Sequence, residues 1–241
     1  MLALINYKKI IKSRQTRLAI LRFLSFIPDS WMIRCQYRMK TGHRLNLKKP
    51  QRYSEKVQWY KLNYRNELMP QCVDKYDVRK YVKSCGLEEI LNECYGVYDS
   101  PDEIDFSVLP EQFVLKDTLG SGGNSVIICT DKSKLDIPAV TEQMRGWVKI
   151  NHRIKTGGRE WPYSAGKPHR IIAEKYIPSN PEKGGLIDYK FFCFQGRAEF
   201  LYVIADREIG SDGAFGVFDR EFRKLNCRIF IARTDAKAEA P

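Results

Sequence analysis

The spacing of hydrophobic and polar positions changes about half-way along the chain. Before Pro110, apolar residues recur at helical intervals, as at Val78, Tyr81, Val82 and Cys85, so this half is predicted to be helical. After Pro110, short runs of β-branched and aromatic residues bounded by turn residues predict antiparallel strands. The pattern therefore predicts an α+β fold, with a helical N-terminal region followed by antiparallel sheets.

Local signals place the individual elements. Asp136 followed by Pro138 predicts the start of a helix that carries Val140 and Met144 on one face. Ser54 is predicted to cap an earlier helix. The predicted strands cover residues 113–116, 125–129 and 170–177, and a hairpin is predicted with arms at 188–194 and 197–206.

Positive charge is concentrated at the N-terminal end. The 241 residues carry a formal net charge of +12, and residues 1–56 alone hold fourteen Lys or Arg against two acids. Residues 1–28 contain six basic residues, no acid, and apolar residues between them at helical phasing. Such a helix can lie on an anionic membrane surface. It can equally pack on the protein and leave its basic side in water.

Composition narrows the class of protein. A hydrophobic fraction of 43% is typical of a globular chain, and no run of eighteen apolar residues is present to span a bilayer. The seven cysteines form no Cys-x-x-Cys pair and there are only three histidines, which disfavours zinc sites and disulfide scaffolds. We expect reduced thiols and a cytoplasmic location, with peripheral binding to the inner face of the membrane as an option. No nucleic-acid-binding signature accompanies the charge, so nucleic acid is not an expected partner.

A glycine-rich segment separates two of the predicted strands. It comprises Gly120, Ser121, Gly122, Gly123 and Asn124. Glycine backbones can curl around a polyphosphate and present amide groups to it. Lys116, at the end of the first strand, can add a positive charge. The same pattern also fits a plain hairpin loop beside a surface lysine.

The position of this segment excludes better-known phosphate-binding loops. A P-loop needs Gly-Lys-Ser/Thr followed by a helix, and a dinucleotide fingerprint needs a helix as well, whereas a strand is predicted after Asn124. A protein kinase needs His-Arg-Asp and Asp-Phe-Gly triplets, and neither occurs in the sequence. Of the phosphate-binding structures considered, only a β-hairpin flap that closes over a polyphosphate fits this position.

Further groups suited to a nucleotide follow along the chain. The run Glu174-Lys175-Tyr176-Ile177 ends a predicted edge strand, where main-chain groups can meet the edge of an adenine. Asp188 can accept hydrogen bonds from ribose hydroxyls. Lys190, on the same face of its strand by alternation, can reach phosphate or face solvent. Arg207, after the returning strand, can bind phosphate or pair with an acid.

Taken together, these segments resemble the ATP-grasp superfamily and, more narrowly, the TupA-like ATP-grasp family of teichuronopeptide and cell-surface polysaccharide biosynthesis. The resemblance runs from about residue 45 to about residue 220. It is carried by the order and spacing of Asp74-Lys75-Tyr76, Tyr95-Gly96-Val97-Tyr98, Phe113-Val114-Leu115-Lys116 with Gly120-Ser121-Gly122, Arg159-Glu160-Trp161-Pro162-Tyr163, Ile171-Ile172-Ala173-Glu174-Lys175-Tyr176-Ile177 and Asp188-Tyr189-Lys190.

The resemblance implies a ligand, a cofactor and a reaction. ATP would lie between two antiparallel sheets, with Mg²⁺ as cofactor. ATP would phosphorylate a carboxylate, and an amine would then displace the phosphate. The acceptor would be a surface polysaccharide or its lipid-linked precursor. The implied contacts are Lys75, Lys116 and Lys190 on phosphates, residues 120–124 closing over them, Glu174, Lys175, Tyr176 and Ile177 on adenine, Asp188 on ribose, and Lys116 and Arg207 in catalysis.

The sequence departs from the family pattern at its C-terminal end. ATP-grasp proteins place Mg²⁺ on acidic and Asn ligands of a late strand, whereas Asn226-Cys227-Arg228-Ile229-Phe230 leads here only into a polar tail. No metal ligand is therefore assigned, and we expect a truncated chain with weak or no turnover. The predicted regions are a basic helical segment (1–53), a helical region (54–110), an incomplete nucleotide-binding region (111–225) and a tail outside the family (226–241).

Two other functions remain open at this stage. One is a glycosyltransferase-like enzyme of the same pathway, although the sequence contains no recognisable sugar-nucleotide site. The other is a module without catalytic activity whose basic residues 1–28 dock it to a membrane. Whether the chain is an active ligase is left open by the missing metal-binding strand.

Overall fold

The computed structural model describes residues 11–121, 123, 125–150, 155–179, 185–205 and 214–226. The chain divides into two compact units, Met1–Tyr176 and Ile177–Pro241, which are described here one at a time. The α-helices of the first unit are α2 (Arg14–Phe23), α3 (Asp29–Thr41), α4 (Tyr53–Asn63), α5 (Leu68–Val73), α6 (Asp77–Ser84) and α7 (Ile137–Val148). Its short 3₁₀ turns are η1 (Leu24–Phe26), η2 (Glu88–Ile90), η3 (Pro101–Glu103), η4 (Lys132–Lys134) and η5 (Trp161–Ser164).

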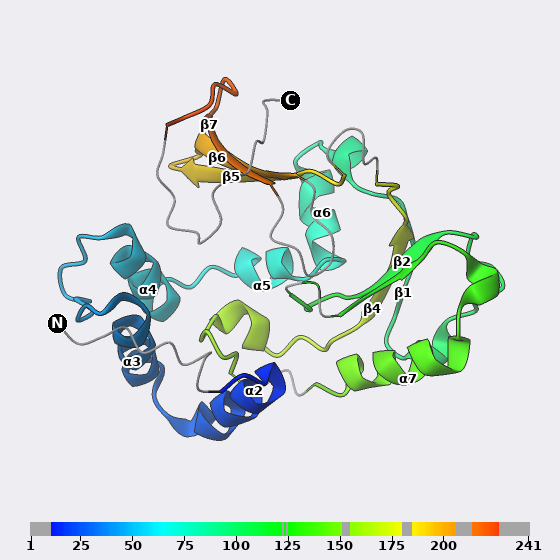
Figure 1. Cartoon of the computed structure of the whole chain (residues 1–241), viewed down its shortest axis with the longest axis horizontal. Coiled ribbons are helices and arrows are strands. Elements are labelled where there is room, and N and C mark those ends of the chain that lie inside the picture. Colours follow the sequence, from blue (N-terminus) through cyan, green and yellow to red (C-terminus); the bar gives the residue numbers. More distant parts are fainter. Residues whose placement is uncertain are drawn as a thin grey trace. The chain divides into compact units, whose positions relative to one another are not determined.

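The basic N-terminal segment forms helices, as its apolar spacing predicts. Helix α2 lies within residues 1–28, and α3 follows directly after η1 (Figure 1). Ile33 and Tyr37 of α3 are buried together with Leu45, and Leu62 of α4 packs against them, which holds α3 on the protein. None of the helices in the described ranges combines the length and the apolar character needed to cross a bilayer.

Helix α4 begins differently from the prediction. Ser54 was expected to be the cap, but Arg52 takes that position, and the buried carboxylate of Glu55 accepts hydrogen bonds from the main-chain N–H groups of Gln51 and Arg52 at 2.9 and 3.0 Å. A Glu at the third helical position reaches back to the cap in this way in a capping box. The prediction at Ser54 was therefore wrong by two residues.

The first unit contains a four-stranded antiparallel sheet. Its strands are β1 (Cys94–Tyr98), β2 (Phe113–Asp117), β3 (Val126–Cys129) and β4 (Ile171–Lys175), in the order β1-β4-β2-β3. Figure 1 shows α7 running along this sheet. Phe113 and Leu115 of β2 pack with Met144 and Trp147 of α7 in the main core. This core covers one face of the sheet. The alternate side chains of β2 and β4 point to the other face, outside this core.

The structure corrects the predicted position of one strand. Residues 171–175 were expected in an edge strand, but β4 lies between β1 and β2. The reason is β1, which the sequence analysis quoted only as a family segment and did not predict as a strand. Because β1 covers that edge, the main-chain N–H of Lys175 bonds to Glu93 O at 2.9 Å and its carbonyl accepts from Asn92 Nδ2 at 2.8 Å.

The second unit contains a three-stranded antiparallel sheet. The predicted hairpin is confirmed as β5 (Asp188–Phe194) and β6 (Arg197–Ala205), and β7 (Ala214–Asp219) joins it on the other side of β6. The turn uses positive φ angles at Gln195 (51°) and Gly196 (75°), which match the twist of a two-residue hairpin. Leu201, Val203 and Phe218 form its small core.

Candidate functional site

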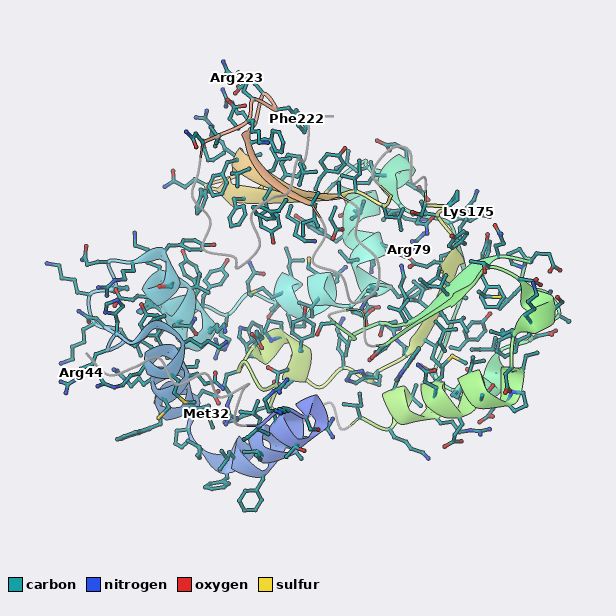
Figure 2. The ribbon with its side chains drawn as sticks, in the orientation of Figure 1. Met32, Arg44, Arg79, Lys175, Phe222 and Arg223 are labelled. Atoms are coloured by element: carbon teal, nitrogen blue, oxygen red, sulfur yellow. The ribbon has the colours of Figure 1, made fainter. Side chains whose placement is uncertain are left out.

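The face of the sheet opposite α7 carries a cluster of charged residues. In the β2–β4 ladder Val114 is opposite Glu174 and Lys116 is opposite Ile172, so Lys116 and Glu174 share this face. Lys116 Nζ lies 2.7 Å from Glu174 Oε2. Arg79 of α6 approaches the other carboxylate oxygen at 3.7 Å, and Figure 2 shows Arg79 near the end of β4, where Lys175 is labelled.

This cluster holds more positive than negative charge. Glu174 is buried, and its single carboxylate faces both Lys116 and Arg79. Lys75 is close enough to both Lys116 and Glu174 to interact with them electrostatically. Two cations, Lys116 and Arg79, on one carboxylate leave one excess positive charge on this face, whereas Lys75 is balanced by Asp117 and Asp74 nearby. Charges in a partly desolvated site act on one another more strongly than in water. The arrangement suits an anionic ligand such as a polyphosphate.

Lys75 is attached to the start of the glycine-rich connection. Its Nζ donates to the carbonyl oxygens of Asp117, Thr118 and Gly120 at 2.8, 3.2 and 2.5 Å, and its main-chain N–H donates to Thr118 O at 2.9 Å. Burial lowers the pKa of Lys75, and repulsion from Lys116 adds to this effect against the attraction of nearby carboxylates. All three ammonium donors are used here, so Lys75 holds the backbone of the loop. Its predicted contact with phosphate stays a prediction.

The glycine-rich segment connects the antiparallel strands β2 and β3, as the sequence analysis expected. Gly120 is required by close packing, since a Cβ added there would lie 2.8 Å from Ser125 Cβ and 3.0 Å from Asp117 Cβ. Gly123 has a φ of 71°, which favours glycine. Gly122 and Asn124 lie outside the described residues. The described part therefore shows a tightly built base, and closure over a ligand is not tested.

Asp117 and His169 form a buried pair that the sequence analysis missed. His169 Nδ1 is 2.8 Å from each carboxylate oxygen of Asp117, and it is the donor because a carboxylate only accepts. Asp117 Oδ1 also accepts from the N–H of Leu119 at 2.9 Å. The sequence does contain one indication of this pair. Phe113 and Leu115 face the core, so alternation places Asp117 on the same face, where an apolar residue would be expected.

A second buried carboxylate holds α6 in place. Asp74 Oδ1 accepts from the N–H groups of Tyr76 and Asp77, both at 2.9 Å, and lies 3.2 Å from the guanidinium of Arg170. Arg170 also bonds to Asp77 at 2.8 Å, and Asp77 is paired with Lys167. Burial alone would raise the pKa of Asp77, but hydrogen bonds from Lys167 and Arg170 lower it. These contacts fix the helix that carries Arg79 over Glu174.

The remaining predicted residues are less closely tied to this cluster. Lys175 is exposed and pairs with Glu93 at 3.3 Å. Directly after β4, Tyr176 is half-buried and Ile177 is exposed. In the second unit Asp188 and Lys190 are 3.3 Å apart, which confirms that they share one face of β5. Arg207 lies outside the described residues, so its predicted role in catalysis is not tested.

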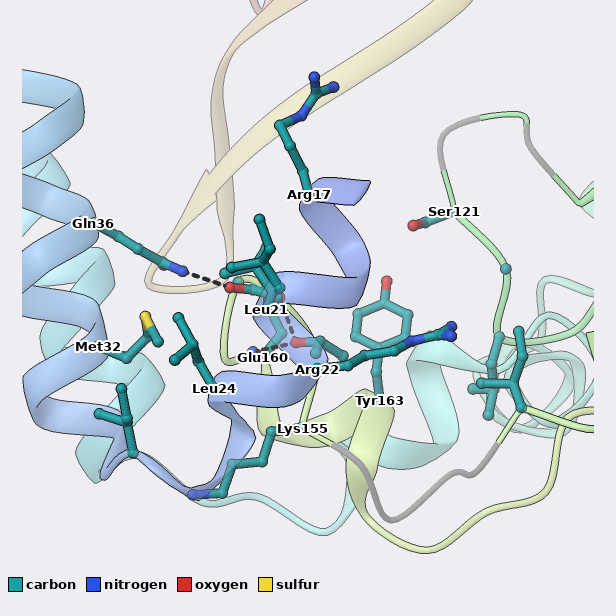
Figure 3. A pocket seen from close by; sticks show the side chains of 18 of the residues that line it. Arg17, Leu21, Arg22, Leu24, Met32, Gln36, Ser121, Lys155, Glu160 and Tyr163 are labelled. Atoms are coloured by element: carbon teal, nitrogen blue, oxygen red, sulfur yellow. Dashed lines mark hydrogen bonds between the residues drawn. The ribbon is translucent and has the colours of Figure 1, made fainter. Parts of the chain in front are cut away.

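A cavity of about 1650 Å³ lies beside the base of the loop. Asp117, Gly120, Ser121 and His169 line one part of it, and residues of α2, η1 and α3 line another. Figure 3 shows Leu21, Leu24 and Met32 together on one side, and Arg22 extending past Tyr163 toward the side where Ser121 lies. No pattern in the sequence predicted this cavity.

The fold and the site define the class of protein to which the chain belongs. Mixed helices and antiparallel sheets, with a lysine beside a glycine-containing hairpin, are consistent with an ATP-grasp-like α+β fold. Residues 55–237 match the TupA-like ATPgrasp family, and the chain belongs to this family. The resemblance seen in the sequence is thereby confirmed. Comparisons with curated proteins and with solved structures gave no match.

Family membership bears on the expected ligands. An ATP-grasp protein is expected to bind ATP and, in general, to use Mg²⁺. Within the described ranges no three His, Cys, Asp or Glu residues come together as a metal site. The segment where Mg²⁺ ligands were sought, residues 226–230, lies outside those ranges except for Asn226, so the missing strand stays a prediction.

Proposed function

We propose that the protein is an ATP-dependent ligase that joins a carboxylate to an amine in cell-surface polysaccharide biosynthesis. The observation that carries this proposal is the cluster of Lys116, Glu174 and Arg79 beside a loop base held by Lys75. Family membership supplies the nucleotide, ATP. The net positive charge of the cluster supplies a place for its phosphates.

The described residues fit the phosphates of ATP. Lys116 can exchange its bond with Glu174 for one with a phosphate oxygen, because Arg79 then remains to neutralise the carboxylate. Lys75 keeps the loop base at a fixed distance from β2 through three carbonyl oxygens. Donors fixed in advance stabilise developing charge without reorganising during the reaction. When bound, ATP supplies the phosphoryl group that activates the acceptor carboxylate.

The remaining nucleotide contacts are assigned by the same proposal. Tyr176 and Ile177 would meet the adenine, and Asp188 the ribose, whereas the carboxylate of Glu174, also predicted at the adenine, is engaged by Lys116 and Arg79. Because β4 is a central strand, the main-chain groups of Lys175 already have partners, so the adenine contacts would come from the residues that follow it. No Mg²⁺ ligand is assigned, and no step of the proposed mechanism depends on one.

A membrane surface is proposed as a partner of the N-terminal helices. Phe23 and Phe26, at the end of α2 and in η1, are 77% and 74% exposed, and their rings contact each other edge to face. Exposed aromatic residues next to a basic helix favour the interface of an anionic bilayer. This surface would place the ligase at the inner face of the membrane, near a lipid-linked acceptor.

A thermal-shift panel tests the proposed reaction class. ATP at about 100 times its dissociation constant stabilises the folded chain by about 2.7 kcal/mol, which corresponds to a rise in Tm of roughly 5–10 °C for a chain of this size. A UDP-sugar and a CMP-sugar at the same concentration should give no rise. A rise with a sugar nucleotide and none with ATP would instead identify a glycosyltransferase-like enzyme and overturn the proposal.

A further inference from the structure

The cavity beside the loop base has walls that the protein holds in place by specific contacts. The buried guanidinium of Arg159 donates to the carbonyl oxygens of Leu24 and Ser25 at 2.8 and 3.2 Å. Gln36 of α3 donates to Gly157 O at 2.7 Å. These contacts join η1, which directly follows α2, and α3 to residues 155–160, so the space between them is a built feature of the first unit.

Most of the cavity surface is apolar. The apolar side chains that line it include Ile20, Leu21, Leu24, Trp31, Met32 and Met39. Trp31 is 68% exposed although it is a large aromatic residue. A volume of about 1650 Å³ is more than a typical ligand pocket of roughly 300–1,000 Å³ offers. A long hydrocarbon chain would gain about 0.8 kcal/mol for each methylene it buries against such walls.

The charges around this cavity are unbalanced. Its two acids already have partners, Asp117 with His169 and Glu160 with Lys61 and Thr156. Among the basic lining residues, Arg22, Lys40 and Lys149 have no hydrogen-bond or ion-pair partner for their side chains within the described ranges. Three uncompensated cations beside an apolar space complement a ligand that has an anionic group at one end.

We infer that this cavity binds an amphiphile with a hydrocarbon chain and an anionic head group. The chain lies against the walls formed by α2, η1 and α3, and the head group lies toward Arg22 and Ser121 (Figure 3). In the reaction this molecule is the acceptor, a part of the inference that rests on the proposed function. Ser121 belongs to the glycine-rich connection, so the head group would lie beside the loop that is proposed to hold ATP.

The cavity differs from the exposed aromatic surface that is proposed to contact the membrane. Phe23 and Phe26 are among the most exposed residues of this region, and neither lines the cavity. Trp31 and Met39 do line it and are also exposed enough to be replaced without disturbing a core. The two surfaces can therefore be separated by matched substitutions of exposed apolar residues.

Fluorescence quenching by 9,10-dibromostearate, kept below its aggregation concentration, tests the inference on the full chain. Bromine atoms quench nearby indoles, so the wild type should show saturable quenching, and Trp31→Phe should lose most of it. Met39→Glu places a charge beside the hydrocarbon chain of the ligand, and Arg22→Glu repels its anionic head group. Each substitution should therefore weaken binding about tenfold or more. Phe26→Glu, which places the same charge at an exposed apolar position outside the cavity, should bind as the wild type does.

Competition tests whether binding requires the hydrocarbon chain, and ATP provides an independent readout. Dodecanoate and dodecyl phosphate should displace the probe, whereas glucuronate, which lacks a chain, should not. Quenching that is unchanged in Met39→Glu and Arg22→Glu, or lost equally in Phe26→Glu, would overturn the inference. If ATP still raises Tm but the probe does not bind, only this inference fails. If the probe binds but ATP has no effect, the proposed function fails and the amphiphile site stands.

Discussion

The base of the glycine-rich connection and the cavity beside it are neighbours in the first unit, yet they are built in opposite ways. At the base, the buried carboxylate of Asp117 is paired with His169, and the partly buried ammonium of Lys75 is bonded to three main-chain carbonyl oxygens. In the cavity, apolar walls meet the cations Arg22 and Lys149, whose side chains have no partner in the described part of the chain. The base holds a backbone in place before any ligand arrives. The cavity leaves its surface available to a molecule that the chain does not contain.

Removing the buried carboxylate at the base should give the largest effect. Asp117→Ala leaves the donors of His169 and Leu119 unsatisfied, so we expect the free energy of unfolding to fall by about 2–5 kcal/mol. Urea unfolding followed by tryptophan fluorescence measures the change. The matched control is Asp136→Ala, which removes an exposed cap from α7 and should cost about 1 kcal/mol. Equal losses in the two variants would show that the buried hydrogen bonds of Asp117 stabilise the fold no more than an exposed helix cap does.

A methyl group at the base should have the next largest effect. Gly120→Ala places a Cβ 2.8 Å from Ser125 Cβ, and such overpacking costs about 1–3 kcal/mol. The same substitution at Gly146, in α7, meets no atom within 4 Å and should stabilise the helix by up to about 1 kcal/mol. Thermal unfolding of both variants compares the signs directly. Stabilisation by Gly120→Ala would contradict the close packing.

Opening the cavity should change local rather than global stability. Arg159→Ala removes the donors to Leu24 and Ser25, so hydrogen exchange in residues 14–41 should become about tenfold faster or more. Exchange in β2 and β4 should stay as it is, and dibromostearate binding should weaken. An increase in exchange across the whole unit would show that the helices and the sheet unfold together. That result would contradict the proposed difference between the cavity and the base of the glycine-rich connection.

The smallest effect concerns pH. Because the pKa of Lys75 is lowered on folding, mainly by burial, the folded chain loses this proton at a lower pH than the unfolded chain does. Between the lowered pKa and the ordinary value of 10.5 the unfolded state binds more protons, so stability rises with pH. Lys75→Met should flatten that rise in pH-dependent unfolding. Lys134→Met, at a side chain 82% exposed, should leave the slope unchanged.

The parts of the molecule that were predictable are those specified by local sequence. Strands β2 and β3 follow from short apolar runs, their connection from its glycines, and α7 from Asp136 with Pro138. The ion pair between Lys116 and Glu174 was not itself predicted, although both residues were assigned to the same ligand, ATP. The family resemblance supplied that link, because 58 residues separate the two along the chain.

The features that were missed depend on contacts between distant segments. Strand β1 is short and contains Gly96, so its alternation gave no strand signal, and without it β4 was placed at an edge. Asp117 and His169 are 52 residues apart. The cavity forms only where α2 and α3 dock on residues 155–160, more than a hundred residues further along the chain. A periodicity in one segment carries no information about such docking.

The most direct test of the account is the affinity for ATP measured by isothermal titration calorimetry on the full chain. Lys116→Met removes a charge-assisted hydrogen bond worth about 1.5–3 kcal/mol, so the dissociation constant should rise roughly 10- to 100-fold. Lys134→Met, which removes an equally charged but exposed side chain, should bind ATP as the wild type does. Wild-type affinity in Lys116→Met would contradict the claim that this lysine and the neighbouring hairpin hold the phosphates of ATP.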